Sequence, residues 1–317
     1  MSDNTLVSIG LVTWNSADHL PTCLAAIAAQ THSACELIVI DNASTDASLE
    51  CLTAYSSTTC VIPNATNLGF AHAHNQAIGL SHGHYYLALN PDVVMQAGYI
   101  SALVGALEQH PECGMAGGKL LLDTEQIDTT GLFIDRRRRQ YLRGHMEVDR
   151  GQYDQPGEVF GIDGAAPLYR RAMIDHIAQD GQFFDESFVT YKEDVDVAWR
   201  ARLLGWTAWY TPAAQASHTR TFRPGQRQRG NPETRRYSVR NRYLMLFKNE
   251  TALGWQRDWL HILSYDLGIL GYMLLLEQAS LTALIDLYRL WPAVQRQRAQ
   301  IMRLKRVAPE AILKWFV

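Results

Sequence analysis

The sequence predicts an α/β fold in which helices flank a mostly parallel central sheet, followed by a helical C-terminal extension. Up to about residue 121, short apolar segments rich in β-branched residues alternate with segments whose apolar residues recur at helical spacing. Strands that alternate with helices imply parallel pairing with right-handed crossovers. Beyond Asn249 the composition shifts to long helical patterns.

The individual elements follow from these patterns. The expected strands are residues 6–12, 36–40, 60–62, 85–89 and 116–121, and helices are expected from Leu20, Leu49 and Ala71. Residues 128–134 favour a hairpin or loop. Residues 205–210 favour an edge strand that Pro212 stops, because proline cannot donate a ladder hydrogen bond.

Composition limits the class of protein. The chain has 317 residues, of which 47% are hydrophobic and 19% charged, enough for one large domain with an appendage. A net charge of −3 argues against a nucleic-acid binder. The five cysteines show no CxxC or zinc-finger spacing, and the amino terminus lacks the features of a signal peptide. We therefore expect reduced thiols and a cytoplasmic protein.

The strand at 85–89 runs into Asn90-Pro91-Asp92. Pro91 breaks the strand, so Asp92 is left at its carboxyl end, where open α/β sheets bind ligands. A carboxylate there suits a divalent cation that bridges diphosphate oxygens. The alternative is a turn aspartate that caps a helix starting near Gln96.

Two other polar loops are expected at the same edge of the sheet. They are Thr13-Trp14-Asn15 and the segment that begins Asp41-Asn42. Neither GxGxxG nor GxxxxGK[ST] is present, so no dinucleotide or P-loop site is indicated. Asp41 could accept a hydrogen bond from the imide N–H of uracil or thymine, or residues 41–46 could be only a helix-capping turn.

A cluster of carboxylates stands at the start of a helical pattern, at Glu193, Asp194 and Asp196. The helix macrodipole favours acidic residues in a first turn, which alone could explain them. Three carboxylates in four positions also repel one another, which can raise a pKa in a partly buried cleft. A carboxylate there could take the proton from an attacking hydroxyl group.

Basic residues gather in two places. Residues 136–139 are four arginines, which are usually solvated; the alternative is that they meet anionic lipid or a diphosphate-linked acceptor. The segment from Arg220 to Arg236 interleaves arginines with Gly, Pro and Gln and favours a basic lid over a diphosphate. Nearby His218 is a lone histidine, a kind of residue that is more often structural than a ligand.

The C-terminal segment is apolar and basic. His261 and Asp266 interrupt residues 259–276, so this is a weak transmembrane candidate. Residues 281–306 combine apolar and aromatic positions with arginines, which fits a helix lying on an anionic membrane surface. The alternatives are packing on the rest of the chain and formation of a homodimer.

Several motifs together resemble a known family. The segment 41–46, then Asn67-Leu68-Gly69-Phe70-Ala71 with Asn75, then Leu89-Asn90-Pro91-Asp92 resemble the inverting GT-A glycosyltransferases of family 2, most closely the bacterial rhamnosyltransferase-like branch. The resemblance covers roughly residues 6–250. It implies a GT-A catalytic domain at 1–249, with a nucleotide-sugar part to about 120 and an acceptor part at 121–249. Residues 250–317 would form the helical extension.

The resemblance also assigns roles to residues. It implies that Asp41 reads the base, that Asp92 and His218 hold Mg²⁺ or Mn²⁺, that Asp194 is the general base, and that Glu193 orients the acceptor. Asn90 stands where the family's DxD motif begins, so one carboxylate remains and part of the ligand field must come from diphosphate and water. The residues that would bind the donor are Thr13, Trp14, Asn15, Asp41, Asn67, Gly69, Phe70, Asn90, Ala165, Ala166 and Arg240.

The expected function is therefore transfer of L-rhamnose from dTDP-rhamnose to a cell-surface polysaccharide or a lipid-linked glycan. The expected location is the cytoplasm or the cytoplasmic face of the membrane, without a nucleic-acid partner. Two alternatives stay open. The donor could be a UDP-hexose or a UDP-N-acetylhexosamine, or the chain could be a catalytically silent GT-A scaffold that binds nucleotide sugars.

Overall fold

The computed structural model describes residues 5–54, 60–122, 125–220 and 232–317. The strands are β1 (Val7–Thr13), β2 (Cys35–Asp41), β3 (Cys60–Pro63), β4 (Tyr85–Leu89), β5 (Val93–Met95), β6 (Cys113–Leu121), β7 (Ile127–Thr129), β8 (Leu132–Ile134), β9 (Gln140–Leu142), β10 (Gly157–Val159), β11 (Leu168–Arg170) and β12 (Thr207–His218). The helices are α1 (Leu20–Ala28), α2 (Ser48–Ala54), α3 (Phe70–Leu80), α4 (Tyr99–Gln109), α5 (Arg171–Ile177), η1 (Glu186–Phe188), α6 (Glu193–Leu203), α7 (Pro232–Asn249), α8 (Ala252–Leu275), η3 (Gln278–Leu281), α9 (Thr282–Leu304) and α10 (Pro309–Leu313).

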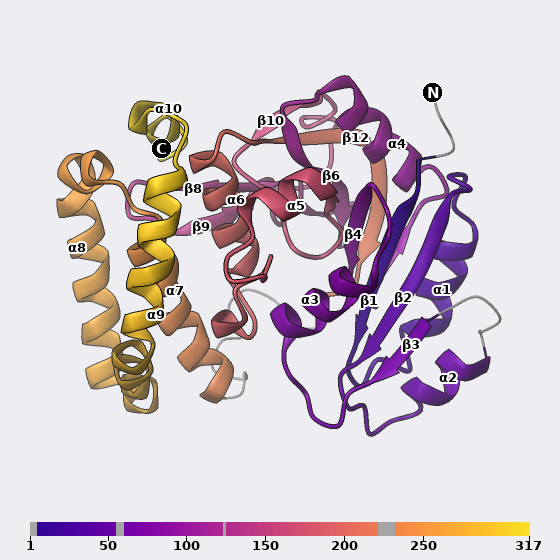
Figure 1. Ribbon diagram of the computed structural model, residues 1–317, viewed down its shortest axis with the longest axis horizontal. Coiled ribbons are helices and arrows are strands. Elements are labelled where there is room, and N and C mark those ends of the chain that lie inside the picture. Colours follow the sequence, from indigo (N-terminus) through magenta and orange to yellow (C-terminus); the bar gives the residue numbers. More distant parts are fainter. Residues whose placement is uncertain (1–4, 55–59, 123–124, 221–231) are drawn as a thin grey trace.

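A ten-stranded sheet forms the centre, in the order β10-β12-β6-β11-β4-β1-β2-β3 with β5 and β7 attached (Figure 1). Strands β3, β2, β1 and β4 are parallel, as the alternating pattern predicts. The register sets Thr13 beside Asp41, so the carboxyl ends of these strands meet at one edge. Strand β11 pairs antiparallel with both β4 and β6, which makes the sheet mixed but mostly parallel.

Helices cover both faces of the sheet and bury two apolar cores. Residues of α1, α2 and α4 pack on one face, and residues of α3, α5 and α6 pack on the other. Strand β4 joins the two cores, because its successive side chains point to opposite faces and all five are buried. The polar strand ends are therefore held at the rim of a sheet that is covered on both sides.

Strand β12 differs from the prediction. It continues from Thr207 through Pro212 to His218 and lies between β10 and β6, so the expectation of an edge strand stopped at Pro212 is wrong. The register of β12 against β6 shifts between Tyr210 and Gln215, and Pro212 lies within that irregularity. At a bulge the backbone N–H of the extra residue is not needed for a hydrogen bond between the strands. Proline, which has no backbone N–H, is therefore tolerated here.

The run of four arginines is solvated only in part, because Arg137 and Arg139 are exposed and the other two are not. It forms the turn between β8 and β9, and Arg138 in the turn is buried. Arg138 Nη1 donates to Asp258 Oδ2 at 2.9 Å, Arg138 Nε donates to Glu250, and Arg136 Nε donates to Asp258 Oδ1 at 2.7 Å. These charged hydrogen bonds fasten the β8–β9 hairpin to the start of α8.

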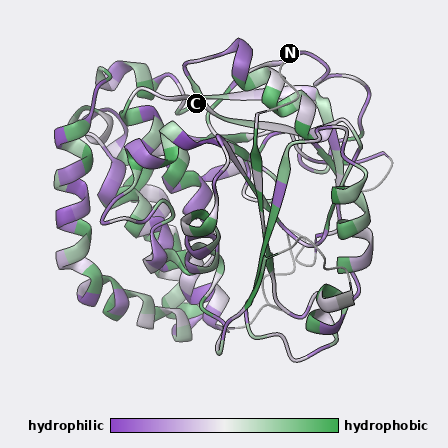
Figure 2. Cartoon of the chain, turned by 45° about the vertical axis from the view of Figure 1, so that its right-hand side comes forward, coloured by the Kyte–Doolittle hydropathy of each residue, from purple (hydrophilic) through white to green (hydrophobic). Residues whose placement is uncertain are grey.

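Helices α7, α8 and α9 stand beside α6 and the β8–β9 hairpin, at the side of the molecule away from β3 (Figure 1). Hydrophobic and hydrophilic residues are interspersed along them (Figure 2). Among the described residues, no helix is long and apolar enough to cross a membrane.

Candidate functional site

Asp41 is fully buried at the carboxyl end of β2. Its Oδ1 accepts hydrogen bonds from Thr13 Oγ1 at 2.9 Å and Ser44 Oγ at 2.6 Å, and its Oδ2 accepts one from the Ser44 N–H at 3.0 Å. The hydrogen bonds expected of a capping turn at residues 41–46 are therefore present. These contacts also fix the carboxylate at the edge of the sheet.

The neighbouring loops are tied together by two asparagines. Asn15 adopts a left-handed conformation (φ 50°), and its Oδ1 accepts a hydrogen bond from the Thr45 N–H at 2.8 Å. Asn42, which is buried, donates to Asn67 Oδ1 at 3.0 Å and accepts from the Leu68 N–H at 3.1 Å. The first two polar loops and the loop before α3 thus form one hydrogen-bonded rim.

Trp14 and Phe70 lie at different positions on this rim. Trp14 is 56% exposed, which leaves its indole face open to a ligand. Phe70 begins α3, packs against His74 and Phe184, and is only partly exposed. Gly69 before it has φ 85°, and a Cβ there would lie 2.6 Å from Val189 Cγ1, so glycine is required at this approach.

Asp92 and His218 are brought together by strand pairing. Strand β5, which the sequence did not predict, pairs antiparallel with β12 and sets Val93 opposite His218. The Thr219 N–H donates to the Asp92 carbonyl oxygen at 3.0 Å, and His218 Nε2 lies 3.4 Å from Asp92 Oδ1. The two residues predicted to hold a metal are therefore neighbours.

Asp128 completes this cluster and was not predicted. It is fully buried on β7, and its Oδ2 lies 2.7 Å from His218 Nδ1. Arg220 donates to Asp128 and, at 3.2 Å, to Asp163 Oδ2. Burial lowers the pKa of His218, but the hydrogen bonds and charges of Asp128 and Asp92 outweigh it and raise that pKa to about 9.

The cluster fits a divalent cation that is shared with a ligand. No group of three or more His, Cys, Asp or Glu side chains in the described ranges could hold a metal alone. Asp92 offers a carboxylate oxygen, and His218 would offer Nε2 after releasing the proton that its raised pKa retains, while Asp128 occupies Nδ1, as carboxylates do behind metal-binding histidines. Mg²⁺ and Mn²⁺ are commonly bound by one or two protein groups plus substrate phosphates, which is what this pair allows.

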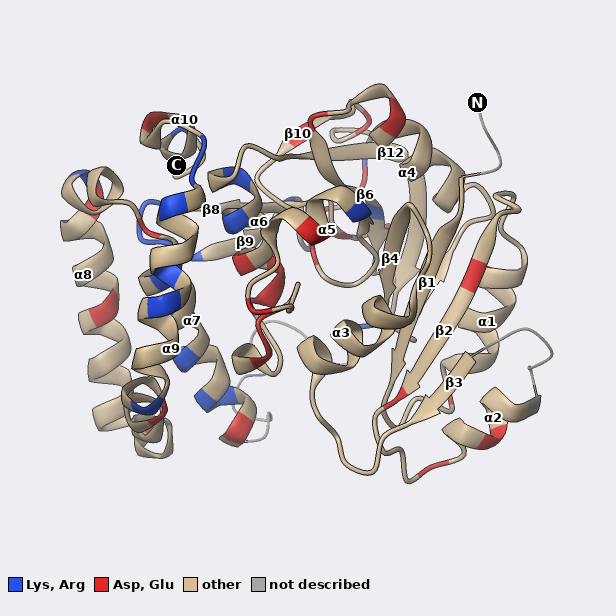
Figure 3. Ribbon diagram, viewed as in Figure 1, with Lys and Arg blue, Asp and Glu red and all other residues tan. Residues whose placement is uncertain are grey.

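The carboxylates at the start of α6 are buried among different partners. Asp196 is an anchor, since it pairs with Arg200 at 2.8 Å and Lys248 at 3.1 Å. Burial, followed by the charge of Asp194, raises the pKa of Glu193 well above its usual range, and Glu193 Oε2 is buried without a described hydrogen-bond partner. Figure 3 shows acidic residues on the ribbon at the start of α6, near the middle of the molecule.

Asp194 has the properties of a general base. Burial first, and then the charge of Asp163, raise the pKa of Asp194 to about 6. The Gly164 N–H donates to its Oδ2 at 3.3 Å, and the Val195 N–H donates to its Oδ1 at 2.8 Å. With that pKa the side chain is mostly ionised at neutral pH and still basic enough to accept a proton.

Gly164 links the base to the donor rim. A Cβ built on Gly164 would lie 3.7 Å from Phe70 Cζ, 3.7 Å from Asp194 Cβ and 3.9 Å from Glu193 Oε1. Residues predicted separately for the donor wall and for catalysis thus surround one point. Ala165 and Ala166 follow directly and are buried, and the Asn90 N–H donates to the Ala165 carbonyl oxygen at 2.9 Å.

The segment before α6 is strained. Val189, Tyr191 and Lys192 have φ of 61°, 67° and 70°, which non-glycine residues rarely adopt. Asn241 on α7 is fully buried, and its Nδ2 lies 2.8 Å from the carbonyl oxygens of residues 188, 190 and 191. Backbone strain of this kind persists when surrounding contacts enforce it and is concentrated at functional sites.

Arg240 lies behind that same segment. Its Nη2 donates to the carbonyl oxygens of Ser187 and Phe188, and its guanidinium stacks on Tyr237 at 4.5 Å. These contacts show that Arg240 helps to fix the conformation of the segment. Its binding to the donor stays a prediction. Of the expected basic lid, residues 221–231 lie outside the described residues, and Arg220 belongs to the cluster around Asp128.

Comparisons with known proteins identify the family of the chain. A family model described as glycosyl transferase family 2 matches residues 8–178. N-acetylglucosaminyl-diphospho-decaprenol L-rhamnosyltransferases from two strains of Mycobacterium tuberculosis are 27% identical over 242 residues, which is 68% of this chain and 76% of theirs. An uncharacterised glycosyltransferase from Haemophilus influenzae is 28% identical over 129 residues, 40% of each chain.

Two solved structures share the fold. GalNAc-T7 with UDP, GalNAc and Mn²⁺ superposes with a TM-score of 0.62 at 12% identity, covering 78% of this chain and 48% of that one. A mannosyltransferase from Pyrobaculum calidifontis with GDP-Man and Mn²⁺ superposes with a TM-score of 0.55 at 15% identity, covering 98% and 83%. The predicted GT-A fold is confirmed, and the matched family domain contains the rim of Asp41, the Asp92 turn and Gly164, whereas Glu193, Asp194 and His218 follow after its last matched residue. The chain belongs to glycosyl transferase family 2 and is a glycosyltransferase.

Proposed function

We propose that the chain transfers L-rhamnose from dTDP-rhamnose, with inversion, to a lipid-linked glycan at the cytoplasmic face of the membrane. The observation that carries the chemistry is the convergence of Phe70, Gly164 and Asp194 at one point beside the donor rim. The choice of sugar and acceptor is supported by the relatives from Mycobacterium tuberculosis, whose name specifies an L-rhamnosyl group and N-acetylglucosaminyl-diphospho-decaprenol.

In this reaction the donor nucleotide lies along the rim. Asp41 accepts the imide N–H of the base, and Trp14 and Asn15 line the nucleotide. Asn67, Gly69 and Phe70 form the wall beside the ribose and diphosphate. Thr13 acts through its hydrogen bond to Asp41.

The reacting groups lie on the other side of Gly164. The acceptor hydroxyl oxygen attacks the anomeric carbon, the bond from that carbon to the diphosphate oxygen breaks, and the hydroxyl proton passes to Asp194. Glu193, whose pKa burial raises well above its usual range, orients the acceptor. Asp92 and His218 would hold a divalent cation, which would offset the negative charge of the diphosphate. Ala165 and Ala166 lie beneath the donor sugar, and Asn90 lines the diphosphate.

A donor panel tests this function. The protein is incubated with dTDP-rhamnose, UDP-hexoses, UDP-N-acetylhexosamines and GDP-mannose, with Mg²⁺, Mn²⁺ or EDTA and a lipid-linked N-acetylglucosamine acceptor. We expect metal-dependent transfer from dTDP-rhamnose at least tenfold faster than from the other donors. Preference for a UDP-sugar would keep the enzyme and change its donor. Binding of donors without turnover of any of them would favour the catalytically silent scaffold, and failure to bind any donor would contradict both.

A further inference from the structure

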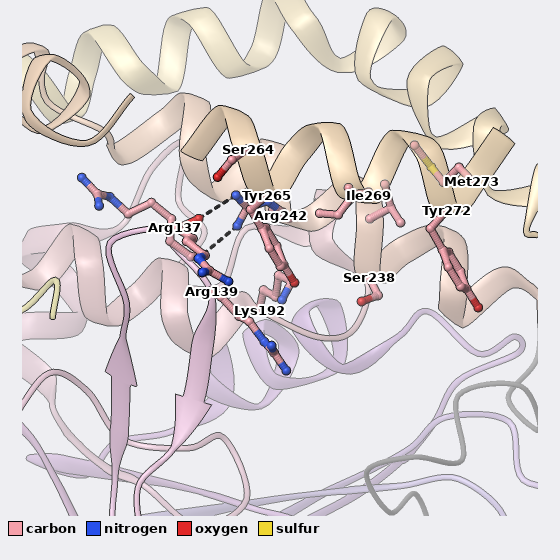
Figure 4. Close-up of a pocket in the computed structure, with 13 residues that line it drawn as sticks. Arg137, Arg139, Lys192, Ser238, Arg242, Ser264, Tyr265, Ile269, Tyr272 and Met273 are labelled. Carbon is pink, nitrogen blue, oxygen red and sulfur yellow. Dashed lines mark hydrogen bonds between the residues drawn. The ribbon is translucent and has the colours of Figure 1, made fainter. Parts of the chain in front are cut away.

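A cavity of about 640 Å³ lies apart from the donor rim, between the β8–β9 hairpin and helices α7 and α8 (Figure 4). Its two ends differ in character. One end holds Arg139 and Lys192, and the other holds Ile269, Tyr272 and Met273. The cavity thus joins a basic end to an apolar end.

The basic end carries positive charge. Of the described residues that line the cavity none is acidic, and Arg242 is already paired with Asp266 at 2.8 Å. Arg139 is exposed, stacks on Tyr141 at 4.7 Å and makes no ion pair with a described residue. Lys192 Nζ donates to the neutral Gln140 side chain at 2.9 Å. Arg137 points away from the other labelled side chains (Figure 4).

The basic end also adjoins the catalytic carboxylates. Lys192 directly precedes Glu193 and Asp194 at the start of α6, and its positive charge acts to lower the pKa of both carboxyl groups. A diphosphate held by Lys192 and Arg139 would therefore bring a sugar attached to it close to Asp194.

The apolar end leads to an exposed apolar tip. Leu274, Leu275 and Leu276 follow Met273 at the end of α8 and are 50%, 80% and 74% exposed. Ile285 and Tyr288 on α9 are also exposed, at 52% and 83%. Residues 265 to 276 span about 16 Å of helix, so the cavity runs along α8 toward this tip. Exposed apolar clusters of this kind mark contact with lipid or with an apolar ligand.

We propose that this cavity binds the diphosphate and first isoprenoid units of a lipid-linked acceptor. Arg139 and Lys192 bind the diphosphate, Ile269, Tyr272 and Met273 contact the isoprenoid chain, and the tip at 274–276 rests on the membrane surface. The assignment rests on the proposed function, in which the acceptor is lipid-linked. A soluble phosphorylated ligand shares the anionic chemistry but makes no use of the apolar end.

Direct binding measurements distinguish a lipid-linked diphosphate from a soluble phosphorylated ligand. Farnesyl diphosphate, inorganic diphosphate and farnesol are titrated by tryptophan fluorescence, with the donor rim saturated by dTDP in one series and UDP in another. We expect farnesyl diphosphate to bind at least tenfold more tightly than either other probe. Arg139→Glu should weaken it at least tenfold, whereas Arg150→Glu, an exposed arginine outside the cavity, should change it less than twofold. Equal binding of inorganic and farnesyl diphosphate would overturn the proposal.

Two glycines on α8 provide a matched pair of variants. A Cβ on Gly268 or on Gly271 meets no neighbouring atom within 4 Å, but only Gly268 lines the cavity. Both changes to leucine improve helix propensity, so neither should prevent folding. We expect Gly268→Leu to weaken farnesyl diphosphate binding at least tenfold and Gly271→Leu to leave it within twofold of wild type.

Kinetics then distinguish the failure of this assignment from failure of the proposed function. In Arg139→Glu and Gly268→Leu, the ratio of the acceptor KM to the donor KM should rise at least tenfold. If donor turnover is intact and this ratio matches wild type, the cavity assignment alone is wrong. If wild type turns over no nucleotide sugar, the proposed function is wrong, and the farnesyl diphosphate titration still decides the cavity.

Discussion

Asp194→Asn is expected to lower kcat by about 10³-fold, because an amide cannot accept the proton of the acceptor hydroxyl. The substitution preserves size, and the amide oxygen can still accept a backbone hydrogen bond from Gly164 or Val195. The Kd of the donor should therefore stay within about threefold of wild type. Stopped-flow transfer and donor titration on the same preparation measure both quantities, and a variant that retains more than a tenth of wild-type kcat would contradict the role.

The stability of the variant provides the control. A carboxyl group whose pKa is higher in the folded protein than in the unfolded chain makes the fold less stable as the pH rises toward and through the folded value, here about 6. Asparagine carries no charge to desolvate, so Asp194→Asn should melt at least as high as wild type at pH 8. Loss of activity with an unchanged or higher Tm would exclude unfolding as its cause.

The same pKa sets the pH profile of wild type. Below pH 6 Asp194 is mostly protonated and cannot act as a base, so kcat/KM should fall about tenfold per pH unit there and level off above it.

Asp92→Ala is expected to weaken binding of Mn²⁺ in the presence of dTDP by at least tenfold and to lower the rate about 100-fold. Without Asp92, the proposed ligands that remain for the cation are His218 and the diphosphate. Electron paramagnetic resonance of free Mn²⁺ measures the affinity without any turnover.

Asp128→Asn tests the same proposed metal site and is expected to have a smaller effect than Asp92→Ala. It leaves both proposed ligands in place and removes the charge behind His218 Nδ1, so a smaller loss of Mn²⁺ affinity, about tenfold, is expected. Unchanged Mn²⁺ binding in Asp92→Ala, or full activity of wild type in EDTA, would contradict the metal assignment.

The sequence predicted the parts of the site that local pattern controls. The apolar strands 36–40 and 85–89 and the polar turns after them appear where expected, because alternating strands and helices place carboxyl ends at one edge. Asp128 escaped prediction, because its role depends on β7 pairing with β6 and on His218, which lies 90 positions further along the chain.

Contacts between residues distant in the sequence also determine which charged side chains are buried. Arg138 appeared solvated because its partners, Glu250 and Asp258, lie 112 and 120 positions away and only the fold brings them together. For Asp194 the direction of the pKa shift was predicted from neighbouring carboxylates. The structure attributes it first to burial and then to Asp163, a residue from a different segment.

The most direct test of the central claim is the anomeric configuration of the transferred sugar. A single displacement with Asp194 as the base and no covalent intermediate requires inversion at the anomeric carbon. NMR of the product made from a donor of known configuration, read from the one-bond C–H coupling at that carbon, should show the opposite anomer. Retention of the donor's configuration would contradict the mechanism.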